Sequence, residues 1–269
     1  MRRITFLVFV CVLMMVLAVS AQAPRGSANA PDRVAAMQQD QPEPPSAEAT
    51  TAQLEDKADV LRVRKSYDQA LVYYSAALRK DPNNSVLYNK RGIAELQLNN
   101  LAAAQKDFQR AIKKNPHYAE AYNNLGVVSY MQRNYKKAIQ RYGKALRLRE
   151  DSASVHGNLG TAWFARRQID KAMAEYARAL ELDPDILLRS SSGGVAARVL
   201  SPEDRAYYSY VLAKIYAKRG DVERCLECLR KAKDEGYSHI KDVNKDPEFA
   251  IVREDPRFVE LMGKPAPQE

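Results

Sequence analysis

The segment NYKKAIQRYGKAL, residues 134–146, returns with the same spacing of small and aromatic residues at three other places in the chain. The related segments are SYDQALVYYSAAL (66–78), NLAAAQKDFQRAI (100–112) and QIDKAMAEYARAL (168–180). Each begins 34 residues after the one before it. A fixed period of this length indicates repeated supersecondary units that stack on one another.

Each segment places an alanine, an aromatic residue and a second alanine at i, i+4 and i+7, which is one face of a helix. The three sets are Ala70, Ala104, Ala138 and Ala172; Tyr74, Phe108, Tyr142 and Tyr176; and Ala77, Ala111, Ala145 and Ala179. Another helix precedes each segment, and in three repeats it carries a glycine (Gly92, Gly126, Gly160) that allows close approach. The aromatic rings are expected to fill the gaps between successive hairpins. Pro82, Pro116 and Pro184 are expected to end the second helices.

A lone hairpin of this kind cannot bury its apolar face, whereas stacked copies bury a continuous core. The sequence therefore predicts an all-α fold, an α-solenoid of stacked helix-turn-helix repeats. The pattern strongly resembles the tetratricopeptide repeat family. The residues that carry the resemblance are Tyr88, Gly92, Ala104, Phe108, Ala111 and Pro116; Tyr122, Leu125, Gly126, Ala138, Tyr142 and Ala145; and Leu159, Gly160, Ala172, Tyr176, Ala179 and Pro184. The first repeat departs from the pattern with Leu54 and Ala58, and the third has Glu150 in place of the proline.

The chain begins with the features of an export signal. Arg2 and Arg3 precede an apolar run over residues 4–18, and the small residues AVSAQA follow. Cleavage is expected after Ala21, which predicts a periplasmic or secreted protein. The alternative is an uncleaved membrane anchor, because the run is nearly long enough to span a bilayer.

The rest of the chain divides into segments of different composition. Residues 22–50 form a linker rich in Pro, Ala and Gln, which is expected to be disordered. The predicted order after the linker is four repeats (51–184), an inserted loop (185–200), a fifth divergent hairpin (201–237), capping helices (238–262) and a disordered tail (263–269). In the fifth hairpin, Ser201 is the expected N-cap and Pro202 the first helical residue. The capping segment resembles the closing helices of many bacterial repeat proteins, which together with the export signal implies an exported bacterial type.

The formal net charge of the 269 residues is +9, and it falls to +7 without Arg2 and Arg3. An exported protein rarely meets nucleic acid, so anionic cell-envelope or protein surfaces are the expected neighbours.

The sequence carries no catalytic motif. Phosphate-loop, His-Glu-x-x-His and Gly-x-Ser-x-Gly patterns are absent, and the three histidines are far apart. We therefore predict no enzyme activity, cofactor or metal. Cys225 and Cys228 form a C-x-x-C pair, for which a redox role or a disulfide is one alternative. The other is packing, because Cys225 takes the position that alanine takes in four other repeats.

The first helices are expected to line a concave groove, where members of the family usually bind extended peptides. The predicted peptide-groove residues are Asn89, Asn123, Asn124, Tyr130, Asn158 and Phe164. The motifs NNLG and GNLG place Asn124 and Asn158 34 residues apart, which is similar to the asparagine ladder of the O-linked N-acetylglucosamine transferase repeats. The alternative is hydrogen bonding between helices within the stack. Glu55 and Asp59 stand at the first positions of the chaperone carboxylate clamp, so a C-terminal carboxylate is a poor ligand.

Between residues 133 and 149 there are basic residues and no acidic ones. Lys137, Arg141 and Lys144 share one helical face and form a predicted basic strip, either a solvated convex surface or a docking strip for an anionic partner. The sequence as a whole predicts an exported, noncatalytic scaffold that binds a protein or peptide of unknown identity in its groove, in the context of cell-envelope assembly. Self-association is the alternative, as is a membrane-anchored adaptor that uses the basic strip.

Overall fold

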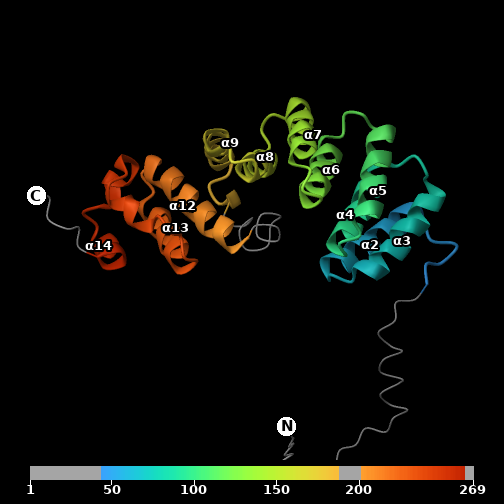
Figure 1. Cartoon of the computed structure of the whole chain (residues 1–269). Helices are drawn as coiled ribbons and strands as arrows, with labels where there is room; N and C mark the ends of the chain where they lie inside the picture. Colours follow the sequence, from blue (N-terminus) through green and yellow to red (C-terminus); the bar gives the residue numbers. More distant parts are fainter. Residues whose placement is uncertain (1–43, 188–200, 264–269) are drawn as a thin grey trace, which may run out of the picture. The chain divides into compact units, whose positions relative to one another are not determined.

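The computed structural model describes residues 44–187 and 201–263. Over these ranges the helices follow one another as hairpins (Figure 1). The first four hairpins are α2 (Thr51–Val63) with α3 (Tyr67–Lys80), α4 (Ser85–Gln97) with α5 (Leu101–Lys114), α6 (Ala119–Met131) with α7 (Tyr135–Leu148), and α8 (Ala153–Ala165) with α9 (Ile169–Leu182). The fifth is α12 (Pro202–Lys218) with α13 (Val222–Asp234), followed by the 3₁₀ helices η1 (Ile240–Asn244) and η2 (Pro247–Val252) and by α14 (Pro256–Met262). The predicted all-α fold class is confirmed.

Several predicted segments lie outside the described residues. These are the signal segment 1–21, the linker up to residue 43, the inserted loop from residue 188 to 200, and the tail from residue 264. Of the helices that the structure describes, none combines the length and the apolar character needed to cross a bilayer.

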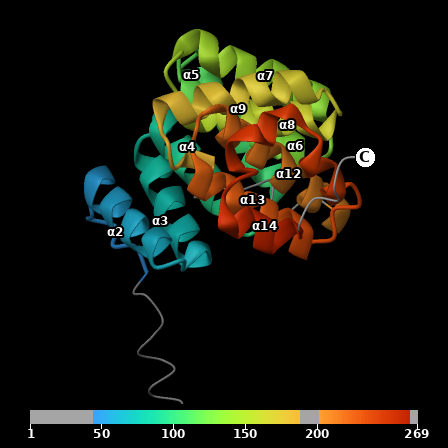
Figure 2. The same cartoon turned by 90° about the vertical axis from the view of Figure 1, so that its left-hand side faces the viewer.

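The hairpins form one stack. The second helix of each packs on the first helix of the next, as α3 does on α4, α5 on α6 and α7 on α8. In Figure 2, α3 accordingly lies between α2 and α4. Neighbouring first helices also touch, α4 with α6 and α6 with α8. Each hairpin thus buries the apolar faces of its neighbours, which confirms the predicted α-solenoid.

The turn inside each hairpin has a fixed backbone conformation. One residue in each of the first four turns has a positive φ near 60°, and these residues are again 34 apart: Lys65, Asn99, Arg133 and Arg167. Gly220 takes this place in the fifth hairpin, with φ 76°. The next amide then donates to the carbonyl five residues back, as Asn134 N does to Ser129 O at 2.8 Å. These bonds satisfy carbonyls at the end of the first helix and reverse the chain within three residues.

The repeated glycines mark a contact within each hairpin, which adds to the packing of the aromatic rings between hairpins, as of Tyr176 on Tyr208 of α12 with ring centroids 5.6 Å apart. A Cβ atom built on Gly126 would lie 2.5 Å from Cε1 of Tyr142, on the second helix of the same hairpin. Gly92 faces Phe108 and Gly160 faces Tyr176 in the same way. The ring therefore lies directly on the backbone of the first helix, and a side chain at the glycine would displace it.

The two ends of the stack are finished differently. At the start, exposed Gln53 and Val60 stand where later first helices bury apolar residues against the preceding hairpin. Those buried equivalents are Leu87, Ala121 and Val155, and Ala94, Val128 and Ala162. At the other end, η2 packs on α12 and α13, and Phe249 and Val252 are fully buried. Terminal repeats need such polar or covered faces to remain soluble.

Candidate functional site

Four asparagines from three successive first helices meet on one face of the stack. Asn89 comes from α4, Asn123 and Asn124 from α6, and Asn158 from α8. Their positions follow from the repeat, because residues 34 or 35 apart occupy neighbouring places on adjacent first helices. We call this surface the amide face.

The asparagine side chains form one continuous hydrogen-bonded chain. Asn158 Nδ2 donates to Asn123 Oδ1 at 3.0 Å, and Asn124 Nδ2 donates to Asn89 Oδ1 at 2.9 Å. Asn123 Nδ2 joins these two pairs by donating to Asn124 Oδ1 at 3.3 Å. Asn89 Nδ2 ends the chain at the hydroxyl of Tyr118, 3.3 Å away. The structure therefore shows the bonding between helices that the sequence left as an alternative, and peptide binding stays a prediction.

This bonding leaves part of each carboxamide available. An asparagine side chain has two N–H donors and one oxygen with two lone pairs, and the chain uses one donor of each residue. Asn123, Asn124 and Asn158 are partly exposed, whereas Asn89 is 5% exposed. The amide face can thus offer both donors and acceptors without breaking its internal bonds, mainly from α6 and α8.

Tyr130 and Phe164 differ from the expectation that they line the groove. Each is 1% exposed, so neither presents a ring to a ligand. Phe164 packs against Tyr207 and Tyr208 of α12, with ring centroids 5.4 and 5.5 Å apart. Tyr130 packs against Tyr135, and burial raises the pKa of its hydroxyl. The helical period places both residues toward the groove side, but the neighbouring helices cover them.

A charged cluster lies next to the amide face on α2 and α4. Lys90 Nζ is 2.6 Å from Glu55 Oε1 and 2.5 Å from Asp59 Oδ2. Asp59 also accepts from the Tyr74 hydroxyl at 2.5 Å, and Arg62 Nε donates to that hydroxyl at 3.2 Å. The sequence singled out Glu55 and Asp59 but missed Lys90. Lys90 comes 35 residues after Glu55, and the hydrogen-bonded pair Asn89 and Asn124 has the same spacing.

A second charged cluster lies on α12. Lys214 Nζ is 3.0 Å from Asp246 Oδ2 and 2.8 Å from Glu248 Oε2, and Lys218 Nζ is 2.7 Å from Glu248 Oε1. The Tyr210 hydroxyl donates to Asp246 Oδ2 at 2.9 Å. The C-terminal segment thus occupies this face of the fifth hairpin. The amide face lies on the hairpins before it.

The predicted basic strip is not a continuous exposed surface. Lys137 is exposed, but Arg141 Nη1 turns inward and donates to Ser129 Oγ at 2.6 Å and to Leu125 O at 3.2 Å. Burial lowers the pKa of this guanidinium. Lys144 is partly buried over the ring of Tyr122. Lys137, Arg141 and Lys144 share one face of α7, but this face borders α6 of the same hairpin. Arg141 and Lys144 therefore contact α6 and are not fully exposed to solvent.

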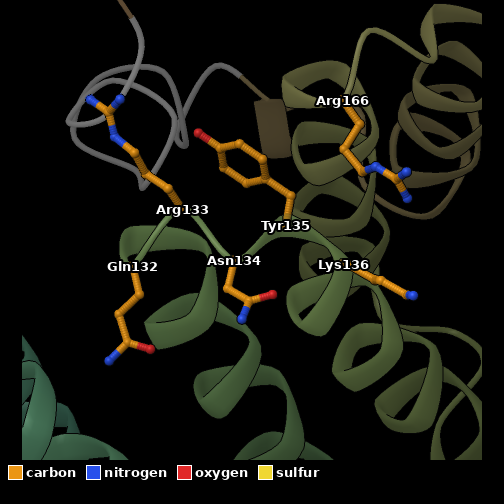
Figure 3. A pocket seen from close by; sticks show the side chains of 6 residues that line it. All are labelled: Gln132, Arg133, Asn134, Tyr135, Lys136 and Arg166. Atoms are coloured by element: carbon orange, nitrogen blue, oxygen red, sulfur yellow. The ribbon is translucent and has the colours of Figure 1, made fainter.

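A hollow of about 450 Å³ lies at the turns of the third and fourth hairpins (Figure 3). It is lined by Gln132, Arg133, Asn134, Tyr135, Lys136 and Arg166. In Figure 3 the Arg133 side chain points away from Lys136 and Arg166. Its cations therefore do not converge on one point, and the hollow does not form an anion site.

Cys225 and Cys228 are free thiols buried in the fifth hairpin. Burial raises the pKa of each thiol to about 12. Since the thiolate is the reactive form, these side chains are packing residues with little nucleophilic character. Within residues 44–187 and 201–263, no group of His, Cys, Asp and Glu side chains has a metal-binding arrangement.

Two family models described as Tetratricopeptide repeat match the chain, one over residues 89–145 and the other over residues 129–190. No match was found among curated proteins.

Solved structures include similar chains. A MamA chain (41-end) from Desulfovibrio magneticus RS-1 is 19% identical, with a TM-score of 0.50 over 71% of this chain and 97% of that one. TTC0263, a thermophilic TPR protein of Thermus thermophilus, is 21% identical, with a TM-score of 0.50 over 70% and 92%. YrrB, a TPR protein with an unusual peptide-binding site, is 20% identical, with a TM-score of 0.47 over 79% and 97%. At these identities the first two likenesses show the fold alone.

Proposed function

Since residues 89–190 of this chain belong to the tetratricopeptide repeat family, we propose that the protein is an exported, noncatalytic scaffold that binds a protein segment. The segment lies extended along the amide face of α4, α6 and α8. The observation that carries the proposal is the hydrogen-bonded chain of Asn89, Asn124, Asn123 and Asn158.

An extended peptide offers alternating C=O and N–H groups, and each partly exposed carboxamide has a spare donor and a spare acceptor lone pair. The bonds between asparagines hold the amides in position, so little side-chain freedom is lost on binding. Recognition of the backbone makes few demands on the ligand's side chains. The buried Tyr130 and Phe164 support the helices from behind and do not touch the ligand.

Two features favour a scaffold over an enzyme. The thiols of Cys225 and Cys228 are buried with raised pKa values. The imidazole of His156 is occupied on both nitrogens, with Glu175 Oε2 2.7 Å from Nδ1 and the Glu150 carbonyl 3.1 Å from Nε2. Both sets of side chains act as structural contacts.

The stack ends favour a scaffold over self-association. The outer face of α2 carries exposed Gln53 and Lys57 beside exposed Val60, and Phe249 and Val252 cover the last hairpin. End-to-end stacking of two chains would bury these polar groups without partners, which is costly.

Export rests on the sequence of residues 1–21. N-terminal sequencing of the protein from its native host is expected to give a chain that begins at Gln22. A cytosolic chain that retains Met1 would contradict export. A protein exported in this way meets the cell envelope, and we place its binding role in envelope assembly.

A displayed library of random peptides provides a probe for the amide face. Peptides selected on the protein are measured by calorimetry against Asn124→Ala/Asn158→Ala. Each lost hydrogen bond contributes about 0.5–1.5 kcal/mol, so the double variant is expected to bind on the order of tenfold more weakly.

The matched control is Gln109→Ala/Gln140→Ala, which removes two exposed amides from the second helices α5 and α7. Circular dichroism melting establishes that each variant folds. Equal affinity for all three proteins would refute the amide face as the binding site, and so would an equal loss in the control.

A further inference from the structure

The outer sides of α5 and α7 each carry two exposed cations. Lys106 and Lys113 lie seven residues apart on α5, and Lys136 and Arg147 lie eleven apart on α7, so each pair shares one stripe of its helix. Lys113 and Arg147 are also 34 residues apart and hold the same repeat position. Among the described residues, none of the four forms an ion pair. We call these four residues the basic face.

Carboxylates are nearly absent from the two helices. The single acidic residue of α5 is Asp107, which is 3% exposed and bound by Arg91, and α7 has none. The same stripe on α9 instead carries exposed Asp170 and Glu181. The basic face is therefore local, and it ends where the fourth hairpin begins.

Helix stability does not account for this distribution. Cations in the last turn, such as Lys113 and Arg147, are stabilised by the helix dipole. Lys136 lies in the first turn of α7, where the dipole disfavours a positive charge, and Lys137 next to it is exposed as well. An external anion would offset this unfavourable placement.

The structure points to a diffuse anionic surface and not to a compact ligand. The four side chains extend from two separate helices, whose axes in packed proteins lie about 10 Å apart or more. No aromatic residue lies between Lys106 and Lys113 on their stripe, as base stacking would require in a single-stranded nucleic acid site. Export through a signal of residues 1–21, as proposed above, carries the chain across a bilayer and leaves the surface of that bilayer within its reach.

We propose that the basic face of Lys106, Lys113, Lys136 and Arg147 docks on the headgroups of a bilayer that contains anionic lipid. Each cation near such a surface contributes about 1 kcal/mol, and the attraction falls off within the Debye length of about 10 Å at 0.1 M salt. The amide face is on other helices, so docking leaves it free for a partner.

Residues 45–269 are used for the test, because they form a compact unit without the apolar run that would insert regardless of charge. The protein is sedimented with vesicles of phosphatidylcholine, with and without about one part in four of phosphatidylglycerol. Binding is expected with the anionic vesicles alone. It should be lost between about 0.01 M and 1 M salt, as the Debye length falls from about 30 Å to 3 Å.

The test variant changes all four residues of the basic face to glutamine. The matched control changes four other exposed cations, Lys57, Arg205, Arg230 and Lys241, to glutamine. The test variant is expected to lower vesicle partition by up to about a thousandfold, since four cations contribute about 1 kcal/mol each, and the control to retain most of it.

Absence of sedimentation with anionic vesicles at low salt would overturn the proposal. An equal loss in the control would also overturn it, because bulk charge would then explain the binding. Binding of polyglutamate or duplex DNA through these residues, without vesicle binding, would show that the bilayer is the wrong occupant. None of these results bears on peptide binding at the amide face.

Discussion

Arg91 donates two parallel hydrogen bonds to Asp107, from Nε to Oδ2 and from Nη2 to Oδ1, each at 2.7 Å. The pair joins α4 to α5 inside the second hairpin, where Asp107 is 3% exposed. Leu125 and Leu159 hold the place of Arg91 in the next two repeats. The hydrogen bonds to Asp107 raise the pKa of Arg91, so the guanidinium stays charged. One hairpin thus replaces an apolar contact with an ion pair.

Removal of one partner of this pair is expected to destabilise the protein more than removal of both. Arg91→Leu removes both hydrogen bonds of the guanidinium to this buried carboxylate and leaves it the longer contact with exposed Arg110, which should lower the free energy of unfolding by about 3–5 kcal/mol. Arg91→Leu/Asp107→Ala should recover most of that loss, since apolar replacements of buried pairs are often neutral. Urea unfolding measures both.

Arg110→Ala is the control for this series, because Arg110 is exposed and lies 3.5 Å from Asp107. Its effect should be below about 1 kcal/mol. A double variant no more stable than Arg91→Leu would show that the two side chains are not coupled.

Gly126 is expected to tolerate no side chain. A Cβ atom there would lie 2.5 Å from Cε1 of Tyr142, a ring that is 1% exposed and has no room to move. Gly126→Ala should therefore destabilise the chain by about 1–3 kcal/mol through overpacking. Gly143→Ala is the matched control, since its Cβ meets Arg147 at an ordinary 3.8 Å. The control should gain up to about 1 kcal/mol from helix propensity. Equal thermal midpoints for the two variants would contradict the contact.

The fold could be predicted from the sequence because the same packing residues recur in each repeat. Alanine, aromatic residue and alanine recur at a 34-residue period, so the helices and their stacking follow from periodicity. The repeat does not specify what ends each second helix. α5 ends at Lys114 and is followed by Pro116, whereas α7 ends at Leu148 and has Glu150 in place of the proline. Both helices are nevertheless 14 residues long. The proline is therefore not required to end the helix.

The candidate site was predicted less completely, because a repeat position gives a side chain's location but not its partners. Asn124 and Asn158 lie on adjacent first helices as predicted, yet their bonds to Asn89 and Asn123 appear only in three dimensions. Tyr130 and Phe164 share the groove-side positions of their helices but are covered by neighbouring aromatic residues. Such burial depends on residues far away in the sequence.

Replacement of Arg133 by glycine is expected to stabilise the protein. Its φ of 58° lies in the left-handed region, which costs a residue with a Cβ about 1–2 kcal/mol. Arg133→Gly should raise the free energy of unfolding by about 0.5–1 kcal/mol, after the entropy cost of glycine is subtracted. Arg133→Ala is the control and should leave stability unchanged. The converse change, Gly220→Ala, should destabilise the fifth hairpin. A less stable Arg133→Gly would refute the strain argument.

The thiols of Cys225 and Cys228 are expected to resist modification in the folded chain. Their pKa values of about 12 leave almost no thiolate at pH 8, and both side chains are buried. Ellman's reagent should react with them in guanidinium but not in native buffer. Cys225→Ala should cost little stability, because alanine holds this position in four other repeats. Rapid labelling of the native protein would restore the redox interpretation.

Asp59 is expected to make stability depend on pH in the acidic range. Burial raises its pKa, but the hydrogen bonds from Lys90 and Tyr74 outweigh burial and hold the pKa below the ordinary value of 3.8. A depressed folded-state pKa contributes stability above the unfolded value, and this contribution is lost as pH falls toward the folded value. Asp59→Asn should therefore melt below the unchanged protein at pH 7, and the difference should shrink as pH falls below about 4. The control is Asp56→Asn, on the same helix but exposed, which should show no such trend. A difference in melting temperature that stays constant down to pH 3 would show that the carboxylate charge does not hold the cluster together.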